Sequence, residues 1–287
     1  MTDNPLFRIH IMKKILSILL LAWLPQFAAA QSFDHDHKAW TALLKKHVVL
    51  LDGGKASQVR YADIAKERAA LKAYRETLSA VSAQEFARWS KPQQIAFLIN
   101  AYNANTIEKI LTRYPDIRSI WDFGKIFGNP FKDKFFRLLG REFSLDMIEH
   151  ETLRKPGSYN EPRLHFAVNC ASVGCPMLRE EAYVASKLDA QLEEQTRRFL
   201  SDRSRNRYNP QANTLEISEI FKWFSEDWTS GYRGFEGKHP PMQSREQFLA
   251  GYAALLADSP AHQQAIAGRK AGISHLDYDW GLNDIRR

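Results

Sequence analysis

SKPQQIAFLINAYNANTIEKILTRYP, residues 90–115, sets the architecture of this 287-residue chain. Ser90, with Pro92 close behind it, marks the start of a helix, because serine caps a first turn and proline is tolerated within it. Pro115 stops the helix. The apolar side chains surround the axis on most sides, and a helix that is apolar all round is a buried one. The stretch therefore predicts a buried central helix.

Two carboxamides lie on one stripe of this helix. Asn100 and Asn103 are three residues apart and share a face with Ile107. A buried carboxamide must find hydrogen-bond partners, and a satisfied core group is one interpretation of each. The other interpretation is a ligand contact, so we include Asn100, Asn103 and the neighbouring Tyr102 among the candidate substrate-binding residues.

Helices and hairpins surround this centre without regular β-α alternation. Before it, the apolar pattern predicts helices over Trp40–Leu51 and Tyr61–Val81. After it, the patterns predict, in order, a hairpin over 135–145, a helix over 145–153 capped by Ser144, a strand over 163–169, a helix over 187–200, a hairpin over 208–217, helices capped by Ser218 and Ser244 that run to Trp228 and Leu256, and a strand over 273–280. This order favours an α+β fold, a single domain with a buried central helix, antiparallel hairpins and a helical surround.

The first 30 residues have the three parts of a cleavable export signal. Lys13-Lys14 gives a positive start, Ile15 to Leu24 gives an apolar run, and Ala28-Ala29-Ala30 gives a cleavage site before Gln31. Pro25 interrupts the run before it reaches the roughly 20 residues that span a bilayer. We expect a signal peptide over 1–30, an N-terminal helical segment over 31–90 and a core domain over 91–287. The expected product is exported, periplasmic or secreted, with no stable membrane anchor after cleavage.

The charge of the chain points away from nucleic acid. The net charge is +7, and residues 1–30 carry a net +2, which leaves +5 on the rest. Lysine and arginine are mixed with acidic residues throughout, whereas a nucleic-acid binder gathers them on one face or arm. A small-molecule or peptide ligand is the remaining class of partner. The sequence implies no cofactor, and it leaves the oligomeric state open.

The densest chemistry lies in HFAVNCASVGCP, residues 165–176. If this segment begins as a strand, His165 and Asn169 share a face, and His165 and Cys170 are roughly 16 Å apart. They then form no local pair. A base for Cys170 must come from elsewhere, and the candidates are His150, which follows Glu149, and His275 near the C-terminus.

Cys170 and Cys175 are the only cysteines, and three interpretations of them remain open. One is a nucleophile whose thiolate a nearby group favours. The second is a disulfide, structural or redox-active, which would close a small loop and so stabilise the fold only modestly. The third is a metal site, but the spacing is looser than a zinc pair and no second cysteine pair exists, so we assign no metal ligand.

Several ordered motifs resemble the domain-of-unknown-function family numbered 547. They are Asn100 to Asn103, Ser144 to His150, His165 to Cys170 with Cys175-Pro176, Phe221 to Phe224, and Tyr278 to Trp280 with Asn283. The resemblance runs from about Pro92 to Asn283. It implies that the asparagine pair, Glu149, His165, Asn169 and Cys170 belong to one shared architecture. The activity of this family is unsettled, so the resemblance assigns no reaction.

Two hypotheses for the function follow. The first is a thiol-dependent hydrolase or acyl transferase with Cys170 as nucleophile; its candidate catalytic residues are Cys170, His165, Glu149, His150 and His275. Asn169 and Cys175 join the candidate substrate-binding residues. The alternative is a non-catalytic periplasmic binding or scaffold module with a Cys170–Cys175 disulfide.

Overall fold

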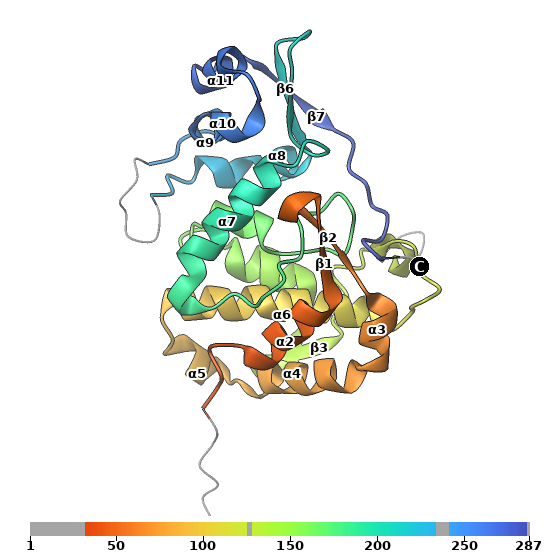
Figure 1. Ribbon diagram of the computed structural model, residues 1–287. Helices are drawn as coiled ribbons and strands as arrows, with labels where there is room; N and C mark the ends of the chain where they lie inside the picture. The colour runs from red at the N-terminus through yellow and green to blue at the C-terminus, as the bar shows by residue number, and fades with distance from the viewer. Residues whose placement is uncertain (1–31, 125–127, 234–240, 286–287) are drawn as a thin grey trace, which may run out of the picture. The chain divides into compact units, whose positions relative to one another are not determined.

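The computed structural model describes residues 32–124, 128–233 and 241–285 (Figure 1). The signal peptide expected over 1–30 lies outside the described residues. Residues 34–287 form one compact unit, an α+β domain, as the sequence predicts. Within the described ranges, none of the helices combines the length and the apolar character needed to cross a membrane.

The centre of this unit is helix α6 (Lys91–Leu111). Ser90 and Gln93 form a capping box, in which each side chain pairs with the other residue's backbone N–H, so the predicted start is confirmed. Every residue from Ile95 to Ile107 is buried. Helix α4 (Arg68–Ala80) and the π-helix η4 (Met147–Leu153) both contact α6. The prediction of a buried central helix is therefore confirmed.

The N-terminal part differs from the prediction at two places. Helix α2 (Lys38–His47) ends early, and Val48–Leu51 forms strand β1, which pairs antiparallel with β2 (Ala56–Val59). The two valines favour a strand, and Gly53 and Gly54 adopt the positive φ values that let the chain reverse. The helix predicted over 61–81 is broken at Glu67 into α3 (Tyr61–Lys66) and α4; a short helix, α5 (Ala83–Ala87), follows.

The middle of the chain follows the prediction up to residue 153. Strands β3 (Phe136–Leu138) and β4 (Arg141–Phe143) form the expected hairpin around a turn at Leu139-Gly140. Ser144 Oγ accepts a hydrogen bond from the Met147 N–H at 3.1 Å, as an N-cap does. The helix it starts is wound more widely than an α-helix, as η4.

The strand predicted over 163–169 is wrong. Pro162–Phe166 forms a 3₁₀ helix, η5, because Pro162 occupies its first turn and the Glu161 side chain accepts the Arg163 N–H at 3.0 Å. The Asn169 N–H then bonds to the Asn103 side chain, at 2.8 Å, and not to a neighbouring strand. The chain therefore turns sharply between His165 and Cys170, and the 16 Å separation expected for a strand does not apply.

The C-terminal part contains a three-stranded sheet in the order β5 (Arg207–Asn209), β6 (Thr214–Ser218), β7 (Gly272–Leu276). The β5–β6 hairpin was predicted, whereas β7 lies parallel to β6 and is shorter than the predicted strand. The two predicted helices are each divided, into α8 (Ile220–Trp223) with η7 (Ser225–Thr229) and α9 (Arg245–Gly251) with α10 (Ala253–Leu256). A further helix, α11 (Pro260–Ala267), and α7 (Leu188–Leu200) complete this part.

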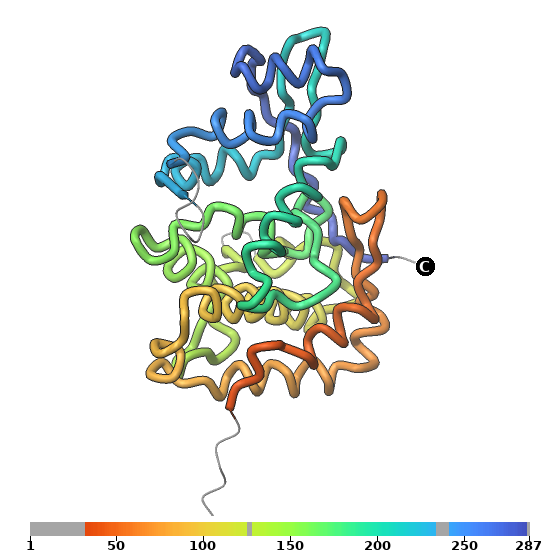
Figure 2. Tube along the Cα trace, turned by 60° about the vertical axis from the view of Figure 1, so that its left-hand side comes forward, coloured from red at the N-terminus to blue at the C-terminus, as the bar shows by residue number. Residues whose placement is uncertain are grey.

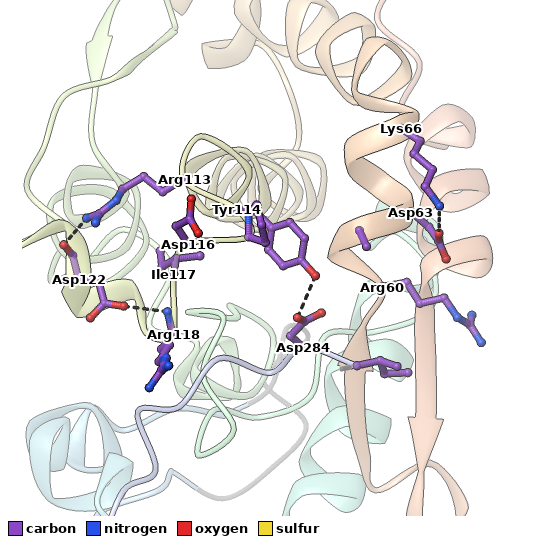
Figure 3. A pocket seen from close by; sticks show the side chains of 13 residues that line it. Arg60, Asp63, Lys66, Arg113, Tyr114, Asp116, Ile117, Arg118, Asp122 and Asp284 are labelled. Atoms are coloured by element: carbon purple, nitrogen blue, oxygen red, sulfur yellow. Dashed lines mark hydrogen bonds and ion pairs between the residues drawn. The ribbon is translucent and has the colours of Figure 1, made fainter. Parts of the chain in front are cut away.

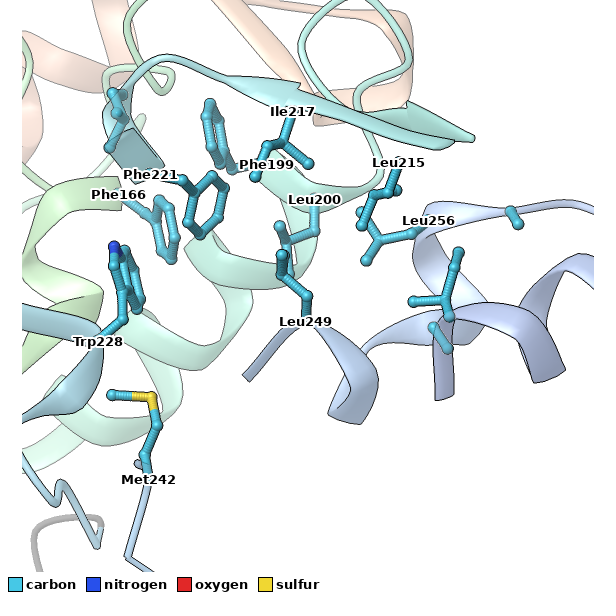
Figure 4. Close-up of a cluster of buried hydrophobic side chains, with 14 residues drawn as sticks. Phe166, Phe199, Leu200, Leu215, Ile217, Phe221, Trp228, Met242, Leu249 and Leu256 are labelled. Carbon is cyan, nitrogen blue, oxygen red and sulfur yellow. The ribbon is translucent and has the colours of Figure 1, made fainter. Parts of the chain in front are cut away.

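Aromatic rings form the core beneath this sheet (Figure 4). Phe166 of η5 stacks on Phe199 of α7 at 5.0 Å and on Trp228 at 5.6 Å between ring centroids. Phe221 packs on Trp228 at 4.9 Å. These contacts hold η5 against α7, α8 and η7. The backbone of His165, which precedes Phe166, is therefore held rigidly.

After β7 the chain returns toward α6 and the N-terminal hairpin (Figure 2). Leu282 pairs with Ser172, and Asp284 pairs with Val59 of β2. This return brings residues 278–284 beside the loop that carries both cysteines.

Candidate functional site

A pocket of about 310 Å³ contains most of the chemistry that the sequence singles out. We call it the thiol pocket. Six of the ten candidate residues line it: Tyr102, Glu149, His150, His165, Cys170 and Cys175. Its other walls are Trp121, Asn129, Phe131, Asp146, Val168, Pro176, Ile220, Trp223, Phe224, Tyr278 and Trp280.

Cys170 lies at the centre of a small polar cluster. Its Sγ is 2.9 Å from Ser172 Oγ and 3.2 Å from Tyr278 Oη, and these two oxygens are 3.0 Å apart. The backbone N–H of Cys170 donates to Sγ of Cys175 at 3.1 Å. Cys170 is half-buried and Cys175 is 5 % exposed, and both are free thiols. The disulfide of the second hypothesis is thus not formed in this structure.

The two thiols are not equivalent as acids. A hydrogen bond from Cys175, with further ones from Ser172 and Tyr278, outweighs burial and lowers the pKa of Cys170 to about 7. Burial and the neighbouring Cys170 raise the pKa of Cys175. Because the thiolate is the nucleophilic form, Cys170 is the reactive member of the pair at neutral pH.

His165 is held by a carboxylate behind it. Its Nε2 is 2.6 Å from Oδ2 of Asp227, and its ring stacks on Phe224 at 4.1 Å. Arg154 binds the same carboxylate through Nε at 2.6 Å and through its terminal nitrogen at 3.2 Å. Burial raises the pKa of Asp227, but the hydrogen bonds from His165 and Arg154 outweigh it, and the pKa falls to about 2.

This arrangement determines the tautomer of His165. Asp227 is ionised at neutral pH and can only accept, so Nε2 carries the proton. Burial lowers the pKa of His165, which keeps the ring neutral. Its Nδ1 therefore presents a lone pair, and among the described residues this buried atom has no hydrogen-bond partner. Oε1 of Glu149 is 4.0 Å away, beyond hydrogen-bond distance.

Glu149 belongs to η4, which packs against α6, and it lines the thiol pocket. It is 8 % exposed, and burial raises its pKa despite the hydrogen bond from Tyr102 and the charges of His150 and Arg154. His150 accepts a hydrogen bond from Arg154 at Nδ1, at 2.5 Å, and turns its other nitrogen toward Asp146 at 3.9 Å. Glu149 and His150 thus line the pocket next to the His165–Asp227 pair.

Three predicted site residues, Asn100, Asn103 and Asn169, do not line the thiol pocket, and their side chains form hydrogen bonds with backbone groups. Asn100 donates to Tyr183 O at 2.7 Å and accepts its N–H at 3.0 Å. Asn103 does the same between Ala167 O, at 3.0 Å, and the Asn169 N–H. The side chain of Asn169 donates to Pro176 O at 2.8 Å. Their amide groups pair with buried backbone, as the core interpretation expects, and their substrate-binding role stays a prediction.

His275 is also placed elsewhere. It lies on β7, where Nε2 is 3.3 Å from Arg245, and it does not line the thiol pocket. Asp227, Ser172 and Tyr278 are the site residues that sequence reasoning missed as partners. Asp227 and Tyr278 are 62 and 108 residues away from the side chains they contact, so no local spacing marks them.

A larger cleft, of about 920 Å³, lies between α3 and the end of α6 (Figure 3). Two contacts between its side chains are an ion pair of Lys66 with Asp63 at 2.9 Å and a hydrogen bond from Tyr114 to Asp284 at 3.1 Å. Among the described residues that line it there is no cysteine or histidine. Across the described ranges, no group of three or more His, Cys, Asp and Glu side chains is arranged to hold a metal ion.

Comparison with known proteins supports the resemblance over part of the chain. Neither a curated protein nor a solved structure matches it. Residues 86–200, the stretch that a family model matches, contain α6, η4, His165 and both cysteines. Asp227 and Tyr278 lie beyond residue 200. Residues 86–200 match the family model described as "Protein of unknown function, DUF547", and this confirms the resemblance to that family over those residues.

Proposed function

We propose that this protein is a thiol-dependent enzyme that carries out acyl transfer or hydrolysis, with Cys170 as its nucleophile. The observation that carries the proposal is the content of one pocket. It holds a thiol with a lowered pKa and a neutral histidine that Asp227 orients and whose Nδ1 has an available lone pair. Nucleophile, base and orienting carboxylate are the three parts that such catalysis needs.

The reaction proceeds in two stages. Cys170 Sγ attacks the carbonyl carbon of an ester, thioester or amide, the bond to the leaving group breaks, and a thioester to Cys170 forms. The proton of the thiol passes to His165 Nδ1 through a water molecule, because the two groups line one pocket without a direct hydrogen bond between them, and it goes from there to the leaving group. In the second stage water, or an acceptor alcohol or amine, gives its proton to Nδ1 as it attacks the thioester, and that proton returns to Sγ.

The walls of the pocket favour an apolar or flat acyl group. Trp121 and Trp223 are 38 % and 43 % exposed at the rim, although each is a large apolar side chain. Trp280 joins them, with centroids 5.3 Å from Trp121 and 5.6 Å from Trp223. Exposed aromatic rings around a concave site bind apolar groups with little change in conformation.

The test is a burst experiment with nitrophenyl esters of phenylacetate and of acetate. We expect about one equivalent of nitrophenol per protein before steady turnover, with the aromatic ester reacting faster. Cys170→Ser should abolish the burst, and His165→Ala should slow both stages. His275→Ala is the matched control, because that histidine lies outside the pocket, and it should behave as wild type.

Two results would count against the proposal. An unchanged burst in Cys170→Ser would exclude that thiol as the nucleophile. Ester binding with no burst, detected as quenching of tryptophan fluorescence, would instead support the non-catalytic binding module.

A further inference from the structure

We propose that Cys170 and Cys175 also act as a dithiol pair that exchanges with small aromatic disulfides and closes into an intramolecular disulfide. This inference shares the Cys170 nucleophile with acyl transfer, but it rests on a separate observation, the position of Cys175. Acyl chemistry at Cys170 assigns no covalent step to the second sulfur.

The loop between the two cysteines is folded so that its ends meet. The residue before Cys170 and the residue after Cys175 are joined, since Asn169 Nδ2 donates to Pro176 O at 2.8 Å. Inside the loop, the Cys175 N–H donates to Ser172 O at 3.2 Å, and Ala171 adopts a positive φ of 64°. The Cys170 N–H to Cys175 Sγ bond, at 3.1 Å, then brings the second sulfur against the first residue.

The two sulfurs have different access to the pocket. Cys170 is half-buried beside the hydroxyls of Ser172 and Tyr278, whereas Cys175 is 5 % exposed, with its Sγ 3.7 Å from Val168 O. The pKa of Cys170 is lowered and that of Cys175 is raised. One thiol is therefore placed to attack a reagent from solution, and the other only to attack its neighbour.

The exchange balances in two steps. The Cys170 thiolate attacks one sulfur of a disulfide R–S–S–R, the R–S–S–R bond breaks, and a mixed disulfide on Cys170 forms as the first thiolate leaves. Cys175 then loses its proton to solvent and attacks Cys170 Sγ, the mixed disulfide breaks, and the second thiolate leaves. The protein is oxidised by two electrons to the Cys170–Cys175 disulfide, and the reagent is reduced to two thiols.

The aromatic walls select the class of oxidant. Trp223 and Trp280 line the same pocket as Cys170, and Tyr278 contacts both of them, with centroids at 4.8 Å and 4.5 Å. A flat aryl thiol group can pack against these rings while its sulfur meets Cys170. A charged aliphatic disulfide lacks that contact, so we expect it to react more slowly.

The test uses the full chain, reduced, with 5,5′-dithiobis(2-nitrobenzoic acid) at pH 8.5, above the pKa of about 7 of Cys170 in the wild type. Wild type should release two thiol equivalents, and the second should appear at a rate independent of reagent concentration because its step is intramolecular. Cys175→Ala should release one equivalent and keep a mixed disulfide that mass spectrometry detects. Cys170→Ser should release at least tenfold more slowly, because Cys175 is buried.

The controls keep this result separate from that of the proposed enzyme. Cys175→Ala should still give an ester burst, but one that forms more slowly at neutral pH, because loss of the Cys175 hydrogen bond raises the pKa of Cys170. The second thiol equivalent should instead be lost completely in this variant, so the two measurements respond differently to the same change. Thermal unfolding of each variant verifies the fold, and Cys175→Ser serves if the alanine variant does not fold. A second equivalent whose rate rises in proportion to reagent, or a stable mixed disulfide in wild type, would overturn the dithiol proposal.

Discussion

The acidity of one thiol is the most direct quantity to measure at the residue level. With the pKa of Cys170 lowered to about 7, its alkylation by iodoacetamide should reach half its maximal rate near that pH, compared with about 8.5 for an ordinary thiol. The sign follows from the thiolate, which is lost as the pH falls below the pKa. Mass spectrometry of the alkylated protein between pH 5 and pH 10 measures the profile.

Variants assign the cause of this shift. Cys175→Ala should move the midpoint upward most, because its hydrogen bond contributes most, and Ser172→Ala and Tyr278→Phe should each move it less. The exposed ion pair of Arg203 and Asp258 gives a control, since Asp258→Asn should leave the profile unchanged. A wild-type midpoint at the ordinary value would show that the cluster does not stabilise the thiolate.

Asp227 is the second residue whose role can be separated. Asp227→Asn removes the charge that orients His165 and favours its protonated form. In a Ser-His-Asp triad the same change is severe, so we expect the deacylation rate to fall on the order of 10³-fold. The burst reports acylation and the steady-state rate reports deacylation, so measuring both separates the two stages. The burst should persist, because the Cys170 thiolate still forms. If wild type and Asp227→Asn deacylate at equal rates, Asp227 has no role in the mechanism.

The elements around the site depend on buried carboxamides, and Asn100 tests that dependence. Asn100→Ala leaves both backbone groups of Tyr183 without their partner, and buried unsatisfied groups each cost about 1–3 kcal/mol, so we expect a loss of about 2–4 kcal/mol in unfolding free energy. Urea denaturation measures it. The exposed Lys72 of α4 gives the control, since Lys72→Ala should change stability by less than about 0.5 kcal/mol. Unaltered alkylation of Cys170 in Asn100→Ala would agree with a structural role, whereas a lost burst in a folded variant would contradict it.

Element starts and hairpins were predictable where local chemistry alone determines them. Ser90 with Pro92 marks the start of α6, and Gly140 marks the turn of the β3–β4 hairpin, because each acts within a few residues. Residues 163–169 were not, because an alternating apolar run resembles a strand. The competing contacts there are the Glu161 side chain on the Arg163 N–H and Asn103 on the Asn169 N–H. The second partner is 66 residues away, and no sequence window contains it.

The same distinction applies to the site. Glu149, His165 and Cys170 converge on one pocket, as motifs that stand in a fixed order within one architecture suggest. Tyr278 completes the pocket from the C-terminal segment, and Asp227 of η7 holds His165. An aromatic run such as residues 221–224 usually packs in a core. Phe224 instead stacks on His165, and Trp223 is exposed. An aromatic residue has the same sequence signature in either position.

At the level of the whole molecule, the C-terminal segment connects parts of the chain that are far apart in sequence. Asn283 accepts the Val59 N–H at 2.9 Å and donates its own to Ala171 O at 3.0 Å. Its side chain accepts from Tyr61 Oη at 2.8 Å and donates to Asn169 at 3.3 Å. Asn283 thus links β2, α3 and the loop over residues 170–175 that carries both cysteines, which we call the thiol loop. The shape of that loop therefore depends on the return of the chain after β7.

Asn283→Ala tests this connection. It removes the partner of the buried Tyr61 hydroxyl, so we expect a loss of about 1–3 kcal/mol in unfolding free energy. The thiol loop should also open more often, because Asn169 loses a contact, and Cys175 should then be alkylated faster under native conditions. Asp277→Ala, an exposed change in the same segment, is the matched control and should alter neither quantity. If Cys175 stays as protected in Asn283→Ala as in Asp277→Ala while stability falls, the loop holds its shape without the C-terminal segment, and Asn169 and Pro176 alone keep the two sulfurs together.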